Sequence, residues 1–350
     1  MVNRLRNRRL ARAAVPALLL LGSSAHAPLL AQDGVDRFSP EMGRHTFRFD
    51  YGALGYFDRH AQPQRRGPAL FSRAAAADDD LSMLRQRLSF VIPLHQSATD
   101  EWLLTPRVTH LLLDTGARLP RSRAALPGSL WDVRVGGLYR HRFDTGIILG
   151  ADLSIGSASD RPFNSGDEWA ADANVFGRFP AGAGNDAWVA YLNYSSNRSF
   201  LPHVPLPGAG YQWLPDERLA LLAGVPLSTL RWEVVEGLTF EGLYFVPREV
   251  RAKLAYRLLR PLSLYVGYDW TSDVFLRHDR ADSDHRLFYC EQRVLGGLRW
   301  DLSEQCWLDV AAGYAFDRFF FEAEEYADRD DSRINIADGP LLRLQVGLRF

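Results

Sequence analysis

The chain has 350 residues, of which 41 are Lys or Arg, 42 are Asp or Glu, and 47% are hydrophobic. Its first 31 residues contain five arginines and no acid, so the remainder carries a net charge of −6 (36 basic against 42 acidic residues). That charge excludes nucleic acid as a partner recognised through a basic surface. Beyond the N-terminus no stretch approaches the ~18 consecutive apolar residues of a spanning helix, so strands must make any membrane crossing there.

The N-terminus has the three parts of a secretory signal peptide. Five arginines lie among the first twelve residues, an apolar run follows over 13–21, and small residues precede two candidate cleavage bonds. The apolar run has about half of the ~20 residues that a spanning helix needs, which argues against an uncleaved anchor. We predict a signal peptide over 1–31 that is cleaved after Ala31, with the bond after Ala27 as the alternative. A periplasmic segment over 32–45 would follow it.

From residue 46 onward, apolar and polar residues alternate in short segments that are separated by turn residues. This alternation is the pattern of a strand with one apolar face, and its repetition indicates a transmembrane barrel. Tight turns join several segments into hairpins. In chain order, the expected strands are 47–51, 84–92, 131–139 with 147–155, 168–179 with 187–197, short segments near 208–214, 218–224 and 229–234, 250–258 with 262–270, 286–301 with 306–318, and 342–350.

The last ten residues show the alternation most clearly. Leucine, valine and a terminal phenylalanine alternate there with Arg343, Gln345, Gly347 and Arg349. A terminal aromatic residue on such a strand resembles the sorting signal that the bacterial barrel-assembly machinery reads, which makes that machinery an expected partner. The residues assigned to this signal are Leu344, Val346, Leu348 and Phe350.

The connections alternate between short turns and longer polar stretches, as in bacterial outer-membrane barrels. With both chain ends on the periplasmic side the strand count is even, and the segments add up to sixteen. Fourteen is the alternative, because five prolines between Pro202 and Pro226 interrupt pairing. The predicted fold is all-β: a transmembrane antiparallel up-and-down β-barrel of 14–16 strands over 46–350. It would lie in the outer membrane of a Gram-negative cell, against lipid and lipopolysaccharide, and the oligomeric state stays open.

Tryptophan placement agrees with this topology. All nine tryptophans fall near predicted strand ends, with Trp307 opening a strand and Trp270 closing one. An indole has a large apolar body and a polar N–H, so it favours the two headgroup levels of a membrane.

If the apolar faces contact lipid, charged side chains line the lumen. One interpretation is a mutually neutralising ladder, and the other is a cationic pore that favours small anions. The residues expected to line such a pore are Arg85, Arg87, Arg134, Arg140, Arg251, Lys253, Arg257, Arg293, Arg299, Arg343, Asp152, Asp172, Asp269 and Glu291.

Other chemistry has weak support in the sequence. Cys290 and Cys306 would form a disulfide by default in an oxidising compartment, but the last hairpin separates them by roughly 35 Å, which predicts two free thiols. The pairs at 278–279 and 284–285 each join His and Asp within one loop, without the spacing of a catalytic triad. Asn-Ser-Gly at 164–166 is interpreted as a turn. No catalytic residue, metal or cofactor is expected.

One stretch resembles a known family. It has P-L-P-G-A-G-Y at 205–211, Pro215-Asp216, L-x-G-x-P at 222–226 and L-R-W at 230–232, and the likeness continues loosely to the C-terminus. The sequence resembles an uncharacterised family of bacterial outer-membrane barrel proteins, a domain of unknown function. The resemblance implies the same fold and location but no substrate or catalytic residue.

The leading functional prediction is a non-enzymatic, porin-like barrel. It would be a passive pore for small solutes or a structural outer-membrane protein, because 14–16 strands enclose more space than side chains usually fill. Two alternatives stay open: a barrel enzyme that hydrolyses lipid or peptide, and a soluble secreted β-sandwich that binds carbohydrate.

Overall fold

The structure is a computed structural model that describes residues 38–57, 60–65, 79–120, 122–182, 184–246, 249–329 and 332–350. The predicted signal peptide and the first part of the predicted periplasmic segment lie outside the described residues. Among the described residues, no helix is both long and apolar enough to cross a membrane.

Nineteen strand segments and two short 3-10 helices follow one another along the described chain. The first half contains β1 (Arg48–Tyr56), β2 (His60–Arg65), β3 (Asp79–Gln96), β4 (Asp100–Leu104), β5 (Arg107–Thr115), β6 (Ser129–Arg142), β7 (Ile148–Ser159), η1 (Gly166–Glu168), β8 (Trp169–Pro180), β9 (Ala187–Ser195) and β10 (Leu206–Asp216). The second half contains β11 (Leu219–Val225), β12 (Leu227–Val235), β13 (Leu238–Phe245), β14 (Glu249–Leu259), β15 (Leu262–Phe275), β16 (Arg286–Asp301), β17 (Cys306–Ala323), η2 (Tyr326–Asp328), β18 (Ser332–Ile336) and β19 (Gly339–Arg349).

These segments form one closed antiparallel barrel of sixteen strands. Three pairs of segments, β1 with β2, β4 with β5 and β18 with β19, are halves of interrupted strands, because both halves pair with the same neighbours. The barrel closes where β1 pairs with β19, with Arg48 opposite Arg349. The count of sixteen is confirmed over fourteen, because the proline-rich middle forms β10, β11 and β12. Closure also excludes the β-sandwich alternative.

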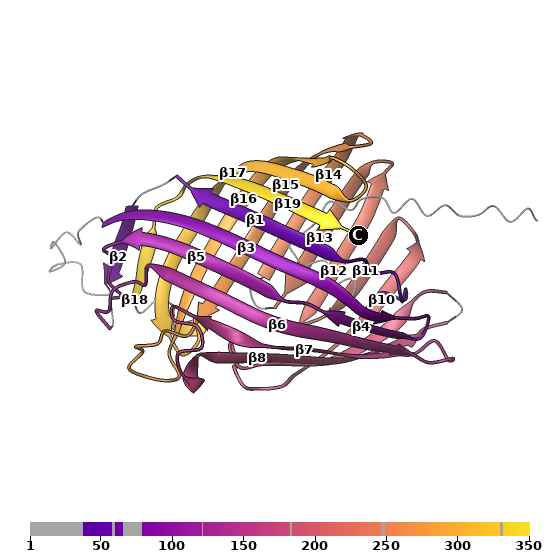
Figure 1. Cartoon of the computed structure of the whole chain (residues 1–350), viewed down its shortest axis with the longest axis horizontal. Coiled ribbons are helices and arrows are strands. Elements are labelled where there is room, and N and C mark those ends of the chain that lie inside the picture. Colours follow the sequence, from indigo (N-terminus) through magenta and orange to yellow (C-terminus); the bar gives the residue numbers. More distant parts are fainter. Residues whose placement is uncertain are drawn as a thin grey trace, which may run out of the picture.

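The two ends of the barrel differ in their connections (Figure 1). Seven short turns lie at the end that also holds the C-terminus, and most of the longer loops lie at the other end. Two connections at the loop end are short, because Pro226 alone joins β11 to β12 and residues 246–248 join β13 to β14. The wall is therefore low on that side: β11, β12 and β13 have 7, 9 and 8 residues, against 18 for β3, 16 for β16 and 18 for β17.

The predicted alternation of faces is confirmed. Along β16, Arg293, Leu295 and Arg299 are buried inside the barrel, whereas Val294 and Leu298 are exposed on its outside. An outward apolar belt on a closed barrel can only be stable in a membrane, since in water it would expose a large apolar surface. The chain is an outer-membrane β-barrel.

The C-terminal strand has the expected geometry. Leu342 and Leu344 are exposed outward, and Arg343 between them is buried inward. Phe350 is exposed on the outside, where its ring lies 6.1 Å from the ring of Phe47 and its N–H donates to the Phe47 carbonyl. Reading of this strand by the assembly machinery stays a prediction.

Side chains fill much of the barrel toward its loop end. A buried apolar cluster joins the inner faces of opposite walls, with Leu81, Leu111 and Leu130 on one side and Tyr289 and Phe320 on the other. Large apolar side chains on both walls fill the space between them, so they pack against one another across the lumen without leaving a cavity. The barrel is consequently partly filled there by its own side chains.

Cysteine and tryptophan positions test two finer predictions. In the strand register, Cys290 is opposite Phe319 toward the loop end, and Cys306 is opposite Leu348 near the short turns. Both thiols are free, so this prediction is confirmed. One tryptophan position is wrong, because Trp270 lies within β15, which continues to residue 275. Trp307 opens β17 as predicted, but its side chain is buried inside the barrel and not at the headgroup level. There the Arg299 guanidinium stacks 4.3 Å from the centre of its ring.

Candidate functional site: the lumen cavity

The barrel encloses a cavity of about 510 Å³, a volume within the ~300–1,000 Å³ of ordinary ligand sites. Strands from both halves of the chain line it, together with the first described residues of the N-terminal segment. Eight of the fourteen predicted lumen residues border it: Arg85, Arg87, Arg134, Arg251, Arg293, Arg343, Asp152 and Asp172.

The other six predicted residues do not border the cavity. Asp269 and Glu291 are buried and bind Arg293. Arg140 is buried beside the N-terminal segment. Three residues lie toward the short turns: the Lys253 ammonium lies 4.4 Å from the centre of the Tyr265 ring, Arg299 binds Asp301, and Arg257 is exposed.

Three further arginines border the cavity that the sequence did not single out. Arg48 occupies an inward position of β1. Its alternation with the apolar residues Phe47 and Phe49 is a signal in the sequence that could have identified it as a lumen residue. Arg107 stands first in β5, and Arg198 comes from the loop after β9, where no periodic pattern marks an inward direction. Burial lowers the pKa of the Arg198 guanidinium, which still remains charged at neutral pH.

The cavity surface carries an excess of positive charge. Nine arginines face five carboxylates around it. The carboxylates are Asp132, Asp152, Asp172, Asp273 and Glu249, and the arginines are Arg48, Arg85, Arg87, Arg107, Arg134, Arg198, Arg251, Arg293 and Arg343.

Behind this surface, buried acids hold the arginines in place. Glu291 is fully buried, and one of its oxygens accepts from the Arg293 guanidinium at 2.8 Å and lies 3.6 Å from that of Arg85. Its other oxygen accepts from the hydroxyls of Tyr56 at 2.6 Å and Tyr289 at 3.0 Å. Arg293 also donates to Asp269 at 2.9 Å. The neutralising ladder is thus present. Its members Glu291 and Asp269 lie behind the arginines, whereas five other carboxylates share the cavity surface with them.

A second ion-pair group lies on the neighbouring wall. Arg134 donates to Asp132 at 2.6 Å and also binds Asp172. Arg107 is less tightly held, because its nearest carboxylate, that of Asp172, is 3.9 Å away. Charged side chains fixed in this way present oriented N–H donors to the lumen.

Part of the remaining cavity surface is apolar. It belongs to a cluster on β8, β9 and β11–β13 that includes Phe176, Leu227 and Leu243, with Tyr191 and Phe245 packed against it. Eight of the nine arginines come instead from β1, β3, β5, β6, β14, β16 and β19. The cavity therefore has a cationic wall and an apolar wall, the latter formed by Phe176, Tyr191, Leu227, Leu243 and Phe245. Strands β8 and β9 also bring polar side chains to the cavity, among them Asn174 and Asn193.

The N-terminal segment lies inside the barrel at the short-turn end. Phe38 is buried, with its ring 5.3 Å from that of Phe176. The buried Arg140 donates to the carbonyls of Ser39 and Glu41, both at 3.2 Å. His45 binds Glu101 through its Nδ1 at 2.7 Å. This segment is anchored to the inner wall and narrows the lumen below the cavity.

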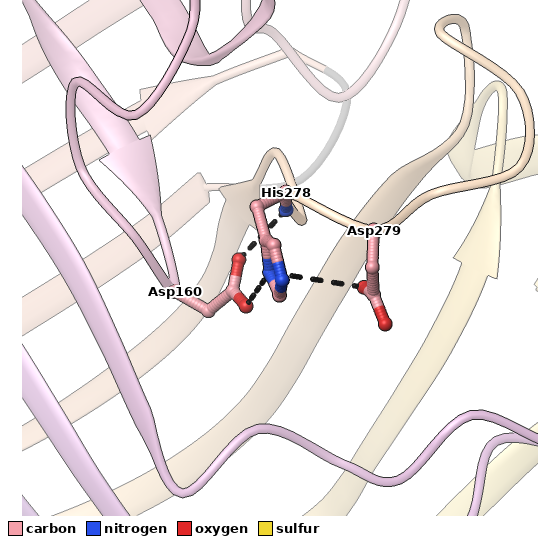
Figure 2. A group of neighbouring side chains, drawn as sticks. All are labelled: Asp160, His278 and Asp279. Atoms are coloured by element: carbon pink, nitrogen blue, oxygen red, sulfur yellow. Dashed lines mark hydrogen bonds and ion pairs between the residues drawn. The ribbon is translucent and has the colours of Figure 1, made fainter.

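His278 at the loop end does not form a catalytic pair with its neighbour Asp279. Figure 2 shows it bound instead to Asp160, whose carboxylate accepts from the backbone N–H at 2.8 Å and contacts Nδ1 at 2.6 Å. Asp279 is 4.0 Å from the same Nδ1 and accepts from Arg277 at 2.6 Å. These contacts tie the loop after β15 to the end of β7.

Two other features of the loops bear on chemistry. Asp282, His285 and Glu324 also bring ligand atoms close together, as Asp160, His278 and Asp279 do, and within the described ranges these are the two groups with such spacing. Ser165 caps η1 and forms a capping box with Glu168, so the interpretation of 164–166 as a turn is confirmed.

Comparisons with known proteins agree on the fold only. No protein-family model matches the sequence, and no curated protein matches it. Solved structures with a similar arrangement include an outer membrane channel from Pseudomonas putida F1, 12% identical over 87% of this chain and 96% of that one, with a TM-score of 0.36. The toluene transporter TodX of Pseudomonas putida is 9% identical over 89% and 90%, with a TM-score of 0.39. The translocator domain of the autotransporter NalP from Neisseria meningitidis is 9% identical over 92% of both chains, with a TM-score of 0.32.

At these TM-scores the likenesses carry no argument about what this chain transports or binds. The fold and location that the resemblance at 205–232 implied, an outer-membrane barrel, are confirmed by the barrel itself. The expectation that the chain is not an enzyme stays a prediction.

Proposed function

We infer that this outer-membrane barrel is a channel that admits small anionic solutes. The observation that supports the inference is the cavity surface, on which nine arginines face five carboxylates. Charge on the wall of a narrow lumen acts strongly on a passing ion, because field lines are concentrated between low-dielectric walls. Glu291 and Asp269 hold Arg293 from behind, and on the cavity surface itself the arginines outnumber the carboxylates.

The N-terminal segment determines the resting state of this channel. Phe38 and the Arg140 contacts hold residues 38–45 against the inner wall. Ions therefore pass either along a narrow path beside this segment or only after the segment has moved. Low conductance with anion preference is the expected resting behaviour.

Single-channel recording in a planar bilayer tests the proposal. In a KCl gradient, the refolded mature chain should show steady openings. Their reversal potential should be shifted from zero toward the equilibrium potential of chloride. Arg107→Gln should reduce that preference, since Arg107 lines the cavity without a close acid. Arg257→Gln is the matched control, since Arg257 is exposed outside the cavity. A folded barrel that stays silent, or one that prefers potassium, contradicts the proposal.

A further inference from the structure

The lumen cavity has the two kinds of surface that an amphiphilic anion needs. Its apolar wall lies on β8, β9, β12 and β13, and its arginines come mainly from other strands. A site for inorganic anions would need only the arginines. A site for hydrocarbons would need only the apolar wall, and buried charges beside it would cost free energy.

The two walls meet where β13 pairs with β14. Leu243 on β13 is the direct register partner of Arg251 on β14, and both side chains border the cavity. Arg251 binds Glu249 at 2.6 Å, which orients the guanidinium. A ligand carboxylate at Arg251 would thus place its attached chain against Leu243.

A buried hydroxyl supplies a further polar contact at this junction. Thr271 on β15 borders the cavity and is 8% exposed, and its Oγ1 is buried without a hydrogen-bond partner. The register partner of Arg251 is Asp269, so Thr271 lies two residues further along the adjacent strand, in a position diagonal to Arg251 on the same inward face. Buried polar atoms in proteins are nearly always hydrogen-bonded, and a ligand oxygen here would satisfy this one.

We propose that the cavity binds an amphiphilic carboxylate, with the carboxylate at Arg251 and Thr271 and the hydrocarbon chain against Leu243, Phe176 and Phe245. The proposal rests on the anion-channel function and specifies its substrate class. A volume of about 510 Å³ accommodates a medium-chain acid, and the apolar wall accounts for selectivity over short acids.

Equilibrium dialysis on the full mature chain in phosphatidylcholine nanodiscs tests this binding, with empty nanodiscs subtracted for partition into lipid. The probes are octanoate, acetate and 1-octanol, which share either the charge or the chain. Octanoate should bind at least tenfold more tightly than either, because each extra buried methylene adds affinity and the alcohol lacks the charge. Equal binding of acetate and octanoate, or of octanol and octanoate, overturns the proposal.

Two variants locate the ligand within the cavity. Arg251→Gln should weaken octanoate binding about tenfold, since a hydrogen bond to a charged group is lost. Arg257→Gln on the same strand, outside the cavity, should leave it unchanged. Leu243→Asn should weaken octanoate but not acetate, with Leu295→Asn as a control of similar burial outside the cavity. Equal loss in test and control variants overturns the assignment.

Chloride conductance of the same protein separates the two proposals. Anion-selective current with equal binding of octanoate and acetate overturns the amphiphile proposal and leaves the anion channel standing. Selective octanoate binding by a barrel that never conducts supports the binding site and overturns the channel. Heat-modifiable gel migration of each variant shows that its barrel is folded.

Discussion

The wall at β15–β17 and the wall at β11–β13 use the same alternating pattern and differ in height and in what lies behind them. β16 and β17 have 16 and 18 residues, or roughly 53–59 Å of strand, whereas β11–β13 have 7 to 9 residues, or roughly 23–30 Å. Behind the tall wall, Tyr265, Tyr289 and Phe320 belong to the large buried cluster. Behind the low wall, Leu227 and Leu243 border the cavity.

This difference shows how one barrel combines stability with an internal cavity. The tall wall packs against the opposite strands, and its arginines are paired with buried acids such as Glu291. The low wall has fewer strand residues, and its buried Leu227 and Leu243 give the cavity part of its apolar surface. The ion pairs around Glu291 therefore belong to the tall wall, and the low wall contributes apolar surface to the cavity.

Glu291 provides the strongest test of the difference between the tall wall and the low wall. Glu291→Gln should destabilise the barrel by about 3–5 kcal/mol, because Arg85 and Arg293 lose a fully buried countercharge. Urea unfolding of the barrel in lipid vesicles measures the change. Glu249→Gln, on β14 next to the low wall, removes a carboxylate that is 28% exposed and should cost under about 1 kcal/mol. Equal losses in the two variants would show that the walls do not differ in this way.

The N-terminal segment is the next test, because it narrows the lumen and packs against the cluster that includes Leu227 and Leu243 of the low wall. Phe38→Ala should remove contacts with Phe176 and Tyr191 worth about 3 kcal/mol and release the segment. Single-channel conductance should then rise severalfold. Phe47→Ala, which alters an aromatic contact outside the barrel, should leave conductance unchanged. An unchanged conductance in Phe38→Ala would mean that the segment does not obstruct flow.

Thiol labelling compares the top of the tall wall with its base. Cys290 is 1% exposed and packs beside Phe288 and Phe319, whereas Cys306 is partly exposed near the short turns. A water-soluble maleimide should label Cys306 at least tenfold faster than Cys290, since reaction needs an accessible thiolate. Mass spectrometry of the Cys290→Ser and Cys306→Ser variants gives each rate. Fast labelling of Cys290 would show that the top of this wall opens.

The smallest effect is expected at the loop histidines. The double variant His278→Ala with His285→Ala should change stability by only about 1 kcal/mol, since the backbone N–H of residue 278 still donates to Asp160 when the imidazole is removed. Reversal potential and octanoate binding should be unchanged, because neither residue borders the cavity. Loss of a hydrolytic activity in this variant would instead favour the enzyme alternative.

Local pattern determined much of this fold. A strand has a period of two, so the identity of neighbouring residues decides which side chains face lipid and which face the lumen. Arg293 and Arg299 are therefore assigned to the inward face correctly without any knowledge of their partners. Turn residues and the even-count rule likewise led to sixteen strands, and the spacing of the last hairpin led to two separate thiols.

The tertiary structure alone decided the site. Glu291 accepts from Tyr56, 235 residues away in the sequence, and Phe38 accepts from Gln212, 174 residues away. Contacts of this kind depend on barrel closure and on the height of each strand, neither of which leaves a periodic signal. The sequence by itself determined which side chains face inward. Closure of the barrel decided which of them are paired, which fill the lumen and which border the cavity, because those outcomes depend on what stands on the opposite wall.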